Sequence, residues 1–356
     1  METIRRLKHA SRRVPEAGLR LRRQMLLKMS GIPWNRTASI LYAPKVTNQI
    51  VKLEKIADSR TITIENSEYG SNLEHHFATR NKIQIKDALI HTMSGNIFIK
   101  SEVSKSWELL VESSEWPVES RITFAKMPRM HREYLRLEGV FLNGLISSNY
   151  YHQMTEDIPS ILAIHRGQKI IGRKRDSKRL MTFGLSDIYD VSDNEFVQVD
   201  RLDFLTKGND VGYLHPHSKD VLIKQLKKYM NQKPTKNIYL SRLKMRRSIP
   251  NEKAVIHFLQ SFDFEIIDAG NMSLEEQINL FSEAETVVAP HGAAITNMVF
   301  SKKAKLLELM PISRINRCFE WQSHICGHGY RVLFYEANVG IDLKRLDSAI
   351  KKMKQI

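Results

Sequence analysis

The sequence predicts an α/β protein whose C-terminal half is a doubly wound, mostly parallel β-sheet. Three observations predict this class. Apolar runs of strand length alternate with amphipathic helices between residues 236 and 311. One run, ETVVAP at 285–290, is apolar almost throughout, which is typical of a strand buried on both faces. Glycine or a helix-capping residue separates the runs, and this alternation indicates parallel strands joined by helices.

The elements of this half follow in chain order. The predicted strands are 236–240, 264–270, 285–290 and 304–311. Asn251 is expected to cap the helix after the first strand. The residues expected on the inward face of that helix are Ala254, Val255, Phe258 and Leu259. Ser273 and Glu276 fit a capping box that opens the second helix, and HGAAITN at 291–297 is expected to form a third, short one.

The N-terminal half is predicted to be rich in short strands. The segments 61–65, 82–90 and 96–100 alternate apolar and polar residues, as half-buried strands do. A further strand and turn lead to a helix that begins near Asn149, and Pro159 is expected to kink this helix or end it one residue earlier. An amphipathic helix spans 217–233. The predicted organisation is a basic segment at 1–36, an N-terminal domain at 37–225 and a C-terminal α/β domain with a terminal helix at 226–356.

The formal net charge of +16 is unevenly distributed, since residues 1–36 hold ten Lys and Arg against two Glu. A second basic cluster lies at 166–179. The N-terminal segment fits an anionic membrane surface, nucleic acid phosphates, or a solvated tail without a partner. Interspersed Leu and Met favour a membrane-surface helix, and the scarcity of aromatics disfavours stacking on single strands. We therefore expect an anionic membrane surface as a partner and no nucleic acid; a basic nucleic-acid-binding protein without enzymatic activity is the alternative.

No apolar run approaches the roughly 20 residues that cross a bilayer, and the first residues lack the apolar stretch of a secretory signal. We expect a cytoplasmic protein, peripheral on the inner face of the cell membrane. Cys318 and Cys326 lie near His324 and His328, but the spacing matches no standard zinc pattern. The prediction here is two reduced thiols and no metal site.

In open parallel sheets, ligands bind beyond the carboxyl ends of the strands. Arg242 and Arg247 follow the first strand of the C-terminal half, and guanidinium groups can bind phosphate oxygens in pairs. The HGAA turn at 291–294 lets a ligand approach the backbone N–H groups of the next helix. This edge predicts a diphosphate site that needs no cation, with Glu308 placed to hold ribose hydroxyls. The ordinary alternatives are a solvated basic loop, a tight turn and a structural ion pair.

The stretch NYYHQMTED at 149–157 is the notable polar cluster of the N-terminal half. On a helix, His152 and Glu156 lie four residues apart on one face, with Asp157 turned about 100° away. A histidine beside a carboxylate can act as a general base. Taken alone, the pattern favours an ordinary surface pair of the two side chains.

Together, NYYHQMTEDIP, YLSR…RRSIPNE, NMSLEEQINLFSEAETVVAPHGAAITNMVF and LLELMP resemble glycosyltransferase family 61. That family includes capsular-polysaccharide biosynthesis proteins of bacteria, plant xylosyltransferases and animal protein O-GlcNAc transferases. The resemblance covers 149–311 in ordered blocks, of which the C-terminal one is specific. It implies a GT-B fold, in which two Rossmann-like domains face a central cleft, together with an inverting mechanism and no Asp-x-Asp metal motif. The sequence contains no Asp-x-Asp.

The resemblance also implies roles for individual residues. Those around the donor diphosphate would be Arg242, Arg247, His291, Gly292, Ala293 and Asn297. Glu308 would bind the ribose, and the nucleotide-side loop and helix would be ordered by Ser273, Glu276 and Gln277. His152 and Glu156 would form the catalytic pair across the cleft. The loop before Asn251 is one residue shorter than in the family, which leaves open whether Arg246 or Arg247 faces the phosphate; we favour Arg247.

The resulting prediction is an inverting, metal-independent glycosyltransferase without a cofactor. It moves a sugar from a nucleotide-diphosphate sugar, with UDP as the default, to a hydroxyl of a glycan or lipid-linked saccharide in capsular or surface polysaccharide synthesis. Glu156, oriented by His152, takes the acceptor proton as the acceptor oxygen attacks the anomeric carbon. The N–H groups after Pro290, with Arg242 and Arg247, stabilise the charge on the leaving diphosphate.

Overall fold

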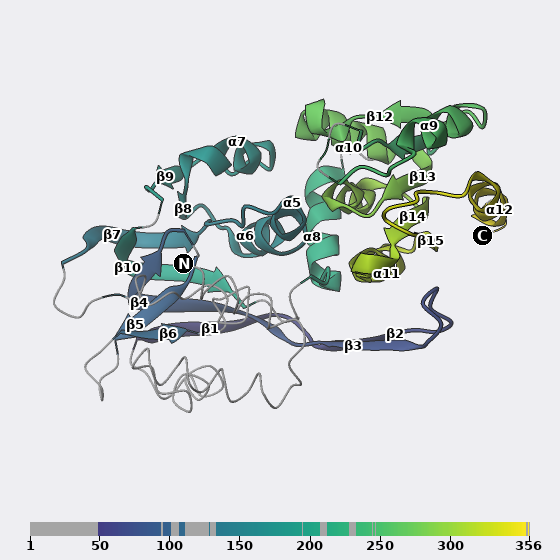
Figure 1. Cartoon of the computed structure of the whole chain (residues 1–356). Coiled ribbons are helices and arrows are strands. Elements are labelled where there is room, and N and C mark those ends of the chain that lie inside the picture. The colour runs from purple at the N-terminus through teal and green to yellow at the C-terminus, as the bar shows by residue number, and fades with distance from the viewer. Residues whose placement is uncertain are drawn as a thin grey trace, which may run out of the picture.

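The computed structural model describes Gln355 and residues 49–353, except residues 94, 101–106, 111–127, 129–132, 194, 207–211, 228–232, 244 and 246. The basic segment 1–36 and Arg246 therefore lie outside the described residues. Figure 1 shows two separate β-sheets, with helices packed between them and around the second one. Within the described part of the chain, no helix is both long enough and apolar enough to cross a membrane.

The second sheet has five parallel strands in the order β12-β11-β13-β14-β15. The bounds are β11 Lys236–Leu240, β12 Glu265–Ile267, β13 Ala284–Pro290, β14 Lys305–Pro311 and β15 Gly329–Tyr335. The predicted α/β class and the four predicted strands are confirmed, and β15 is an additional strand. The chain adds β12 on one side of β11 and then β13 on its other side. The ligand-binding switch point of such a sheet therefore lies between the carboxyl ends of β11 and β13.

Helices cover both faces of this sheet. Helices α9 Glu252–Gln260 and α12 Leu343–Met353 pack on one face, and α12 confirms the predicted terminal helix. The other face carries α10 Leu274–Ser282, the 3-10 helix η8 Ala293–Phe300 and α11 Cys318–Cys326. Val287 of β13 belongs to the apolar cluster on the second face and Val288 to the cluster on the first. Burial on both faces is the reason that this strand is apolar from Val287 to Pro290, whereas Glu285 near its start is exposed.

One predicted cap is wrong in its detail. Asn251 stands at the N-cap position of α9, but its side chain makes no capping hydrogen bond. It instead bonds both backbone groups of Ile341, with Nδ2 donating to the carbonyl oxygen and the amide N–H donating to Oδ1, each over 2.8 Å. The inward face of α9 is also narrower than predicted, because Val255 and Leu259 are buried whereas Ala254 is exposed.

The first sheet is mixed. Its eight strands run in the order β6-β5-β4-β10-β7-β8-β9, with β1 paired to β4. The bounds are β1 Ile50–Ala57, β4 Arg80–His91, β5 Ile97–Lys100, β6 Trp107–Leu110, β7 Leu135–Asn143, β8 Lys169–Gly172, β9 Ile188–Asp190 and β10 Phe196–Leu205. The strands β10-β7-β8-β9 are parallel and the others join antiparallel. Only part of this half is therefore Rossmann-like, and the GT-B arrangement stays a prediction.

A separate hairpin leaves the first sheet. Strands β2 Arg60–Ile64 and β3 Leu73–Phe77 pair antiparallel and extend beneath the second half of the molecule (Figure 1). With β4 and β5, β2 confirms the three strands that alternation predicted in this region.

A long helical stretch follows β7. Helix α5 Tyr150–His152 begins after Asn149, as predicted, and the Asn149 side chain accepts a 2.9 Å hydrogen bond from the Tyr151 N–H. The stretch continues through a π-helical turn, η5 Gln153–Asp157, into α6 Ile158–Ile164. Pro159 therefore does not end the helix, contrary to one of the two expectations. It falls in the first turn of α6, where the hydrogen-bond pattern is already changing and its missing N–H costs little.

The two halves share one apolar cluster. Leu142 of β7 and Ile158 of α6 belong to the same cluster as Ile238 of β11. Helix α8 Pro216–Leu226 lies between the sheets and contributes Leu222 (Figure 1). Its span confirms the predicted amphipathic helix up to residue 226, while residues 228–232 lie outside the described chain. The predicted domain limits stay a prediction.

Candidate active site

The loops at the carboxyl ends of β11 and β13 meet at the switch point of the second sheet. Arg242, two residues beyond β11, donates from Nη1 to the carbonyl oxygen of His291, which follows β13, over 2.7 Å. The Arg242 backbone N–H in turn donates to Oε1 of Glu252, the first residue of α9, over 2.5 Å. Partial burial lowers the pKa of Arg242, although the Tyr335 hydroxyl and Glu252 oppose this effect. A guanidinium group is therefore fixed where the fold places ligands.

His291 is paired with a buried carboxylate. Its Nδ1 lies 2.6 Å from Oε1 of Glu308, and Oε2 of Glu308 accepts a 2.6 Å hydrogen bond from the Tyr330 hydroxyl. Glu308 is fully buried. Because a carboxylate only accepts, His291 donates through Nδ1 and keeps Nε2 for another partner. A ribose would have to displace His291 or Tyr330 to reach Glu308, so the predicted ribose contact stays a prediction.

The predicted turn after β13 is present, and its helix is a 3-10 helix. Gly292 has an extended backbone, and a Cβ placed on it would lie 3.0 Å from Arg242 Nη1. The first helical hydrogen bond runs from the Ile295 N–H to the Gly292 carbonyl over 3.0 Å. The N–H groups of Gly292, Ala293 and Ala294 precede that bond and lie at the helix start. Small residues are thus needed here so that the arginine can approach the backbone.

Asn297 and Gln277 hold helices together in this structure. Asn297 is fully buried; its Nδ2 donates to Gln277 Oε1 over 2.6 Å, and its Oδ1 accepts from the Tyr150 hydroxyl over 2.5 Å. This chain joins η8 and α10 to the start of α5. Ser273 and Glu276 form the predicted capping box of α10, which is confirmed. None of these contacts tests the donor-binding roles that the resemblance implied.

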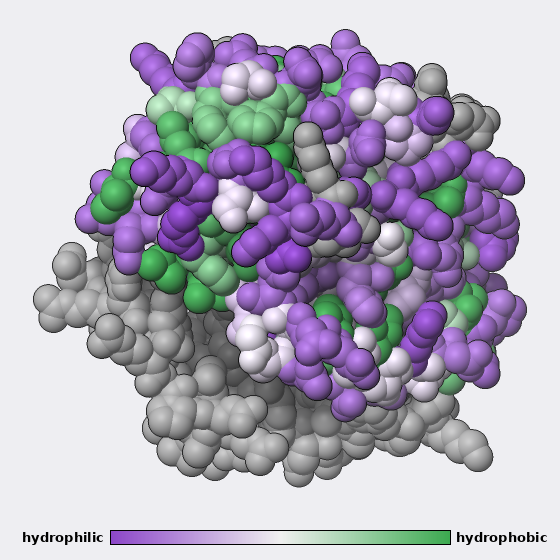
Figure 2. Space-filling view, turned by 90° about the vertical axis from the view of Figure 1, so that its right-hand side faces the viewer, coloured by the Kyte–Doolittle hydropathy of each residue, from purple (hydrophilic) through white to green (hydrophobic). Residues whose placement is uncertain are grey.

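Arg247 is exposed in the loop between β11 and α9. Among the described residues, no hydrogen bond joins its guanidinium group to His291 or to η8. Its predicted phosphate contact stays a prediction, and the choice between Arg246 and Arg247 is open because Arg246 is outside the described residues. Figure 2 shows that the face of the molecule on the side of the second sheet is mainly hydrophilic, with apolar residues in small patches.

On the other side of the site, His152 and Glu156 form a buried pair. His152 Nδ1 lies 2.8 Å from Glu156 Oε1, which also accepts a 3.2 Å hydrogen bond from the Gly212 N–H. Both side chains are almost inaccessible to solvent, so the interpretation as a surface pair is wrong. Asp157 faces elsewhere: its Oδ2 accepts a 2.7 Å hydrogen bond from the Ser147 N–H in the loop after β7.

Arg80 is a buried residue behind this pair that the sequence did not indicate. It donates to the Thr206 carbonyl over 3.1 Å and to the hydroxyls of Ser218 and Ser160 over 2.9 and 2.6 Å. Burial lowers the pKa of Arg80 to about 10, and the charge of Glu156 acts in the opposite direction. No sequence signal marks Arg80, because it opens a strand among other polar residues.

The rings of Tyr151 and Phe319 lie between His152 of the N-terminal half and His291 of the C-terminal half. The Tyr151 ring lies 5.6 Å from the His152 ring and 5.5 Å from the Phe319 ring, measured between centroids. Phe319 lies 5.4 Å from the His291 ring. The predicted catalytic pair and the predicted donor residues are therefore brought to either side of one aromatic contact.

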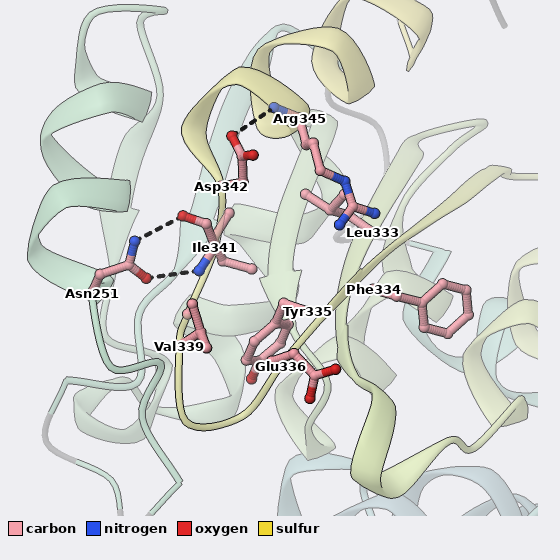
Figure 3. A pocket seen from close by; sticks show the side chains of 10 residues that line it. Asn251, Leu333, Phe334, Tyr335, Glu336, Val339, Ile341, Asp342 and Arg345 are labelled. Carbon is pink, nitrogen blue, oxygen red and sulfur yellow. Dashed lines mark hydrogen bonds between the residues drawn. The ribbon is translucent and has the colours of Figure 1, made fainter.

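A cavity opens at the carboxyl end of β15. It has a volume of about 330 Å³, and Figure 3 shows its wall formed by Leu333, Tyr335, Val339 and Ile341, with Asn251 bonded to Ile341. Burial raises the pKa of Tyr335 and the charge of Arg242 opposes this effect, so the tyrosine of the cavity wall lies within electrostatic range of the switch point. The size falls at the lower end of small-molecule sites, which span about 300 to 1,000 Å³.

Cys318 and Cys326 lie on α11 and are not joined to each other. Burial raises the pKa of both thiols, to about 12 for Cys326. In the part of the chain that the structure describes, no group of three or more His, Cys, Asp or Glu side chains is arranged to hold a metal ion.

The glycosyltransferase 61 family model matches residues 150–307, which include the His152–Glu156 pair, Arg242 and His291. This match, which covers a little under half of the chain, confirms the resemblance to glycosyltransferase family 61 seen in the sequence. No curated protein matches it. Among solved structures, a flavo di-iron protein mutant from Thermotoga maritima is similar over 85% of this chain and 98% of its own, with 14% identity and a TM-score of 0.28. A TM-score this low supports no conclusion about the fold or the function of this chain.

Proposed function

We propose that the chain is an inverting, metal-independent glycosyltransferase that uses a nucleotide-diphosphate sugar, with UDP as the expected nucleotide. The acceptor is a hydroxyl of a glycan or lipid-linked saccharide in capsular or surface polysaccharide synthesis. The observation that carries the proposal is the Arg242 guanidinium held 2.7 Å from the His291 carbonyl at the switch point of the parallel sheet. It faces the start of η8, where three N–H groups precede the first helical bond.

In this proposal the donor diphosphate binds between Arg242 and the N–H groups of Gly292 and Ala293. Nε2 of His291 is proposed to donate to the same diphosphate; because Nδ1 already donates to Glu308, this requires the imidazolium form of the ring, which carries a proton on both nitrogens. Cationic and N–H donors fixed in advance stabilise negative charge on a leaving diphosphate without reorganising during the reaction. They would supply the charge that a metal ion supplies in other transferases. We propose that the nucleoside occupies the cavity beside Tyr335, whose lining is drawn in Figure 3.

The buried pair His152–Glu156 is proposed as the base of the acceptor side. The acceptor oxygen attacks the anomeric carbon, the bond from that carbon to the diphosphate breaks, and the acceptor proton passes to the pair. Nδ1 of His152 is engaged by Glu156, as is typical of a histidine that takes a proton through Nε2. This geometry favours His152 as the proton acceptor and Glu156 as its partner, the reverse of the order expected from the sequence.

Binding of two probes tests the donor site. By calorimetry, UDP and inorganic pyrophosphate should both bind the wild-type protein, and Arg242→Gln should weaken both about tenfold or more, because a hydrogen bond to a charged group is worth roughly 1.5–3 kcal/mol. Val339→Trp, which fills the cavity, should weaken UDP and leave pyrophosphate unchanged. Val140→Trp on β7 is the matched control. If neither probe binds the wild-type protein, the proposed donor site is wrong.

Release of UDP from a UDP-sugar, with water as the acceptor, tests the base. His152→Ala and Glu156→Gln should lower the rate of release at least a hundredfold, within the range of general base catalysis. Donor binding should remain as in the wild type. Unchanged turnover in either variant would remove that residue from the proposed mechanism.

The membrane association is a proposal about residues 1–36, which hold ten Lys and Arg against two Glu. Basic residues near an anionic leaflet contribute about 1 kcal/mol each, so the segment should retain the enzyme on the inner face of the cell membrane. Flotation with anionic and neutral liposomes, with and without residues 1–30, tests this directly. Absence of binding by the full chain to anionic liposomes would contradict it.

A further inference from the structure

The tip of the β2–β3 hairpin docks on the second half of the molecule close to the proposed donor site. The Ser67 hydroxyl and the Glu68 N–H both donate to Oε1 of Glu320 on α11, over 2.7 and 3.0 Å. The Glu68 carboxylate accepts from Arg331 Nη1 and from the Val332 N–H, each over 3.4 Å. Contacts of both backbone and side chains fix the tip against β15 and α11.

Tyr69 follows at this tip and points toward β15. Its hydroxyl lies 3.1 Å from the Tyr330 hydroxyl, and its ring packs edge-on against Phe334 with 5.4 Å between centroids. The Arg317 guanidinium lies 4.8 Å above the same ring. Burial, and then the charge of Glu308, raise the pKa of Tyr69, which shows that its hydroxyl is within electrostatic range of the buried carboxylate.

The direction of the hydrogen bonds follows from the chemistry of the groups. Glu308 accepts from the Tyr330 hydroxyl and from His291 Nδ1. Because the Tyr330 proton is used on Glu308, Tyr69 is the donor in its contact with Tyr330; its single proton is shared between the Tyr330 oxygen at 3.1 Å and the Asn316 carbonyl oxygen at 3.4 Å, and the shorter contact favours Tyr330. A continuous chain of hydrogen bonds therefore runs from the hairpin tip through Tyr330 to Glu308, which accepts from Tyr330 on one oxygen and from the imidazole of His291 on the other. Chains of this kind strengthen their members in a buried setting.

We propose that Tyr69 is a positioning residue of the donor site, which acts through Tyr330 and Glu308 to hold the His291 imidazole with Nε2 facing the diphosphate. The inference rests on the proposed function for the role of His291, and it extends the site beyond the family match, which begins at residue 150. The hairpin of the N-terminal half is then part of the donor site, and a chain lacking it would hold a misoriented histidine.

Side-chain ¹H–¹⁵N spectra of the thirteen histidines test the relay without any ligand. His291→Gln identifies the signals of His291, which should report a proton on Nδ1 in the wild type. Tyr69→Phe should shift these signals, and Tyr330→Phe should shift them further, since it removes the donor to Glu308 itself. Tyr189→Phe in the first sheet is the matched control and should leave them unchanged. If the His291 signals are the same in Tyr69→Phe as in the wild type, the relay is wrong.

A double-mutant cycle on UDP affinity tests the effect on the site. Tyr69→Phe alone should weaken UDP about three- to tenfold, the worth of one ordinary hydrogen bond. In the His291→Gln background the same change should leave UDP affinity within about twofold, because the relay then has no endpoint. Equal losses in both backgrounds would show that Tyr69 affects UDP binding independently of His291, which overturns the proposal. If wild-type protein does not bind UDP, the proposed function fails, and the spectra still decide the relay.

Discussion

Acid should unfold this protein through two buried histidines. The side chain of His215 caps α8 by accepting a 3.1 Å hydrogen bond from the His217 N–H, and His328 is hydrogen-bonded through Nε2 to the Met298 carbonyl over 2.8 Å. Burial, and then the charge of Arg80, lower the pKa of His215 to about 3. Burial lowers the pKa of His328 to about 4 against the raising effect of the Met298 carbonyl.

The sign follows from proton counting. Between about pH 6.5, the ordinary histidine value, and the folded values, the unfolded chain binds a proton at each site and the folded chain does not. Stability is therefore complete above pH 6.5 and falls as the pH is lowered, by about 1.4 kcal/mol per pH unit for each histidine. From pH 7 to pH 5, His215 and His328 together should remove about 4 kcal/mol, a large part of the 5–15 kcal/mol typical of a folded domain.

Urea unfolding at pH 8, 7, 6 and 5, followed by tryptophan fluorescence, measures this loss. His215→Gln and His328→Gln should start less stable at pH 8, because each loses a hydrogen bond, and each should lose about 2 kcal/mol less than the wild type between pH 7 and 5. His257→Gln on the exposed side of α9 is the control and should keep the wild-type slope. Identical slopes in the wild type and both core variants would refute the reasoning.

Three further outcomes are expected. Asn251→Ala should leave the buried backbone groups of Ile341 without partners, a cost of about 2–4 kcal/mol, and hydrogen exchange at the Ile341 amide should accelerate; unchanged protection would contradict the clamp. Gly292→Ala should fold normally, because the backbone is extended there, yet weaken UDP binding by pushing Arg242 aside; a calorimetric affinity equal to the wild type would count against the placement of the diphosphate. UDP release from a UDP-sugar should persist in EDTA, and strict dependence on added Mn²⁺ would contradict the metal-independent site.

The second sheet could be predicted because its signals are local. The run at 285–290 is apolar on both faces, and Ser273 with Glu276 marks a helix start within four residues. The same locality made the switch point predictable, since Arg242 and His291 directly follow apolar runs. Strand β15 did not stand out, because GYRVLFY mixes polar and aromatic residues at an edge of the sheet.

What the sequence could not predict depends on contacts between distant residues. Asn251 has the residue type and position of a helix cap, but its side chain is hydrogen-bonded to the backbone of Ile341, 90 residues later in the chain. Tyr69 meets Tyr330 across 261 residues, and no spacing rule connects the two. His152 and Glu156 are buried because α5 packs against the second half of the molecule. The i,i+4 spacing of the two residues is the same in a buried pair and in a surface pair, so the sequence alone could not distinguish them.

The packing between the halves limits how the proposed site can open. Separating them would expose Tyr151 and Phe319, each worth roughly 1.5–3 kcal/mol when fully buried, and break the hydrogen bond between Tyr150 and Asn297, worth about 1 kcal/mol. The sum of about 4–7 kcal/mol keeps the separated state below roughly one molecule in a thousand. Donor and acceptor should therefore enter through the loops at the carboxyl edge of the second sheet, while the aromatic contact between His152 and His291 stays closed.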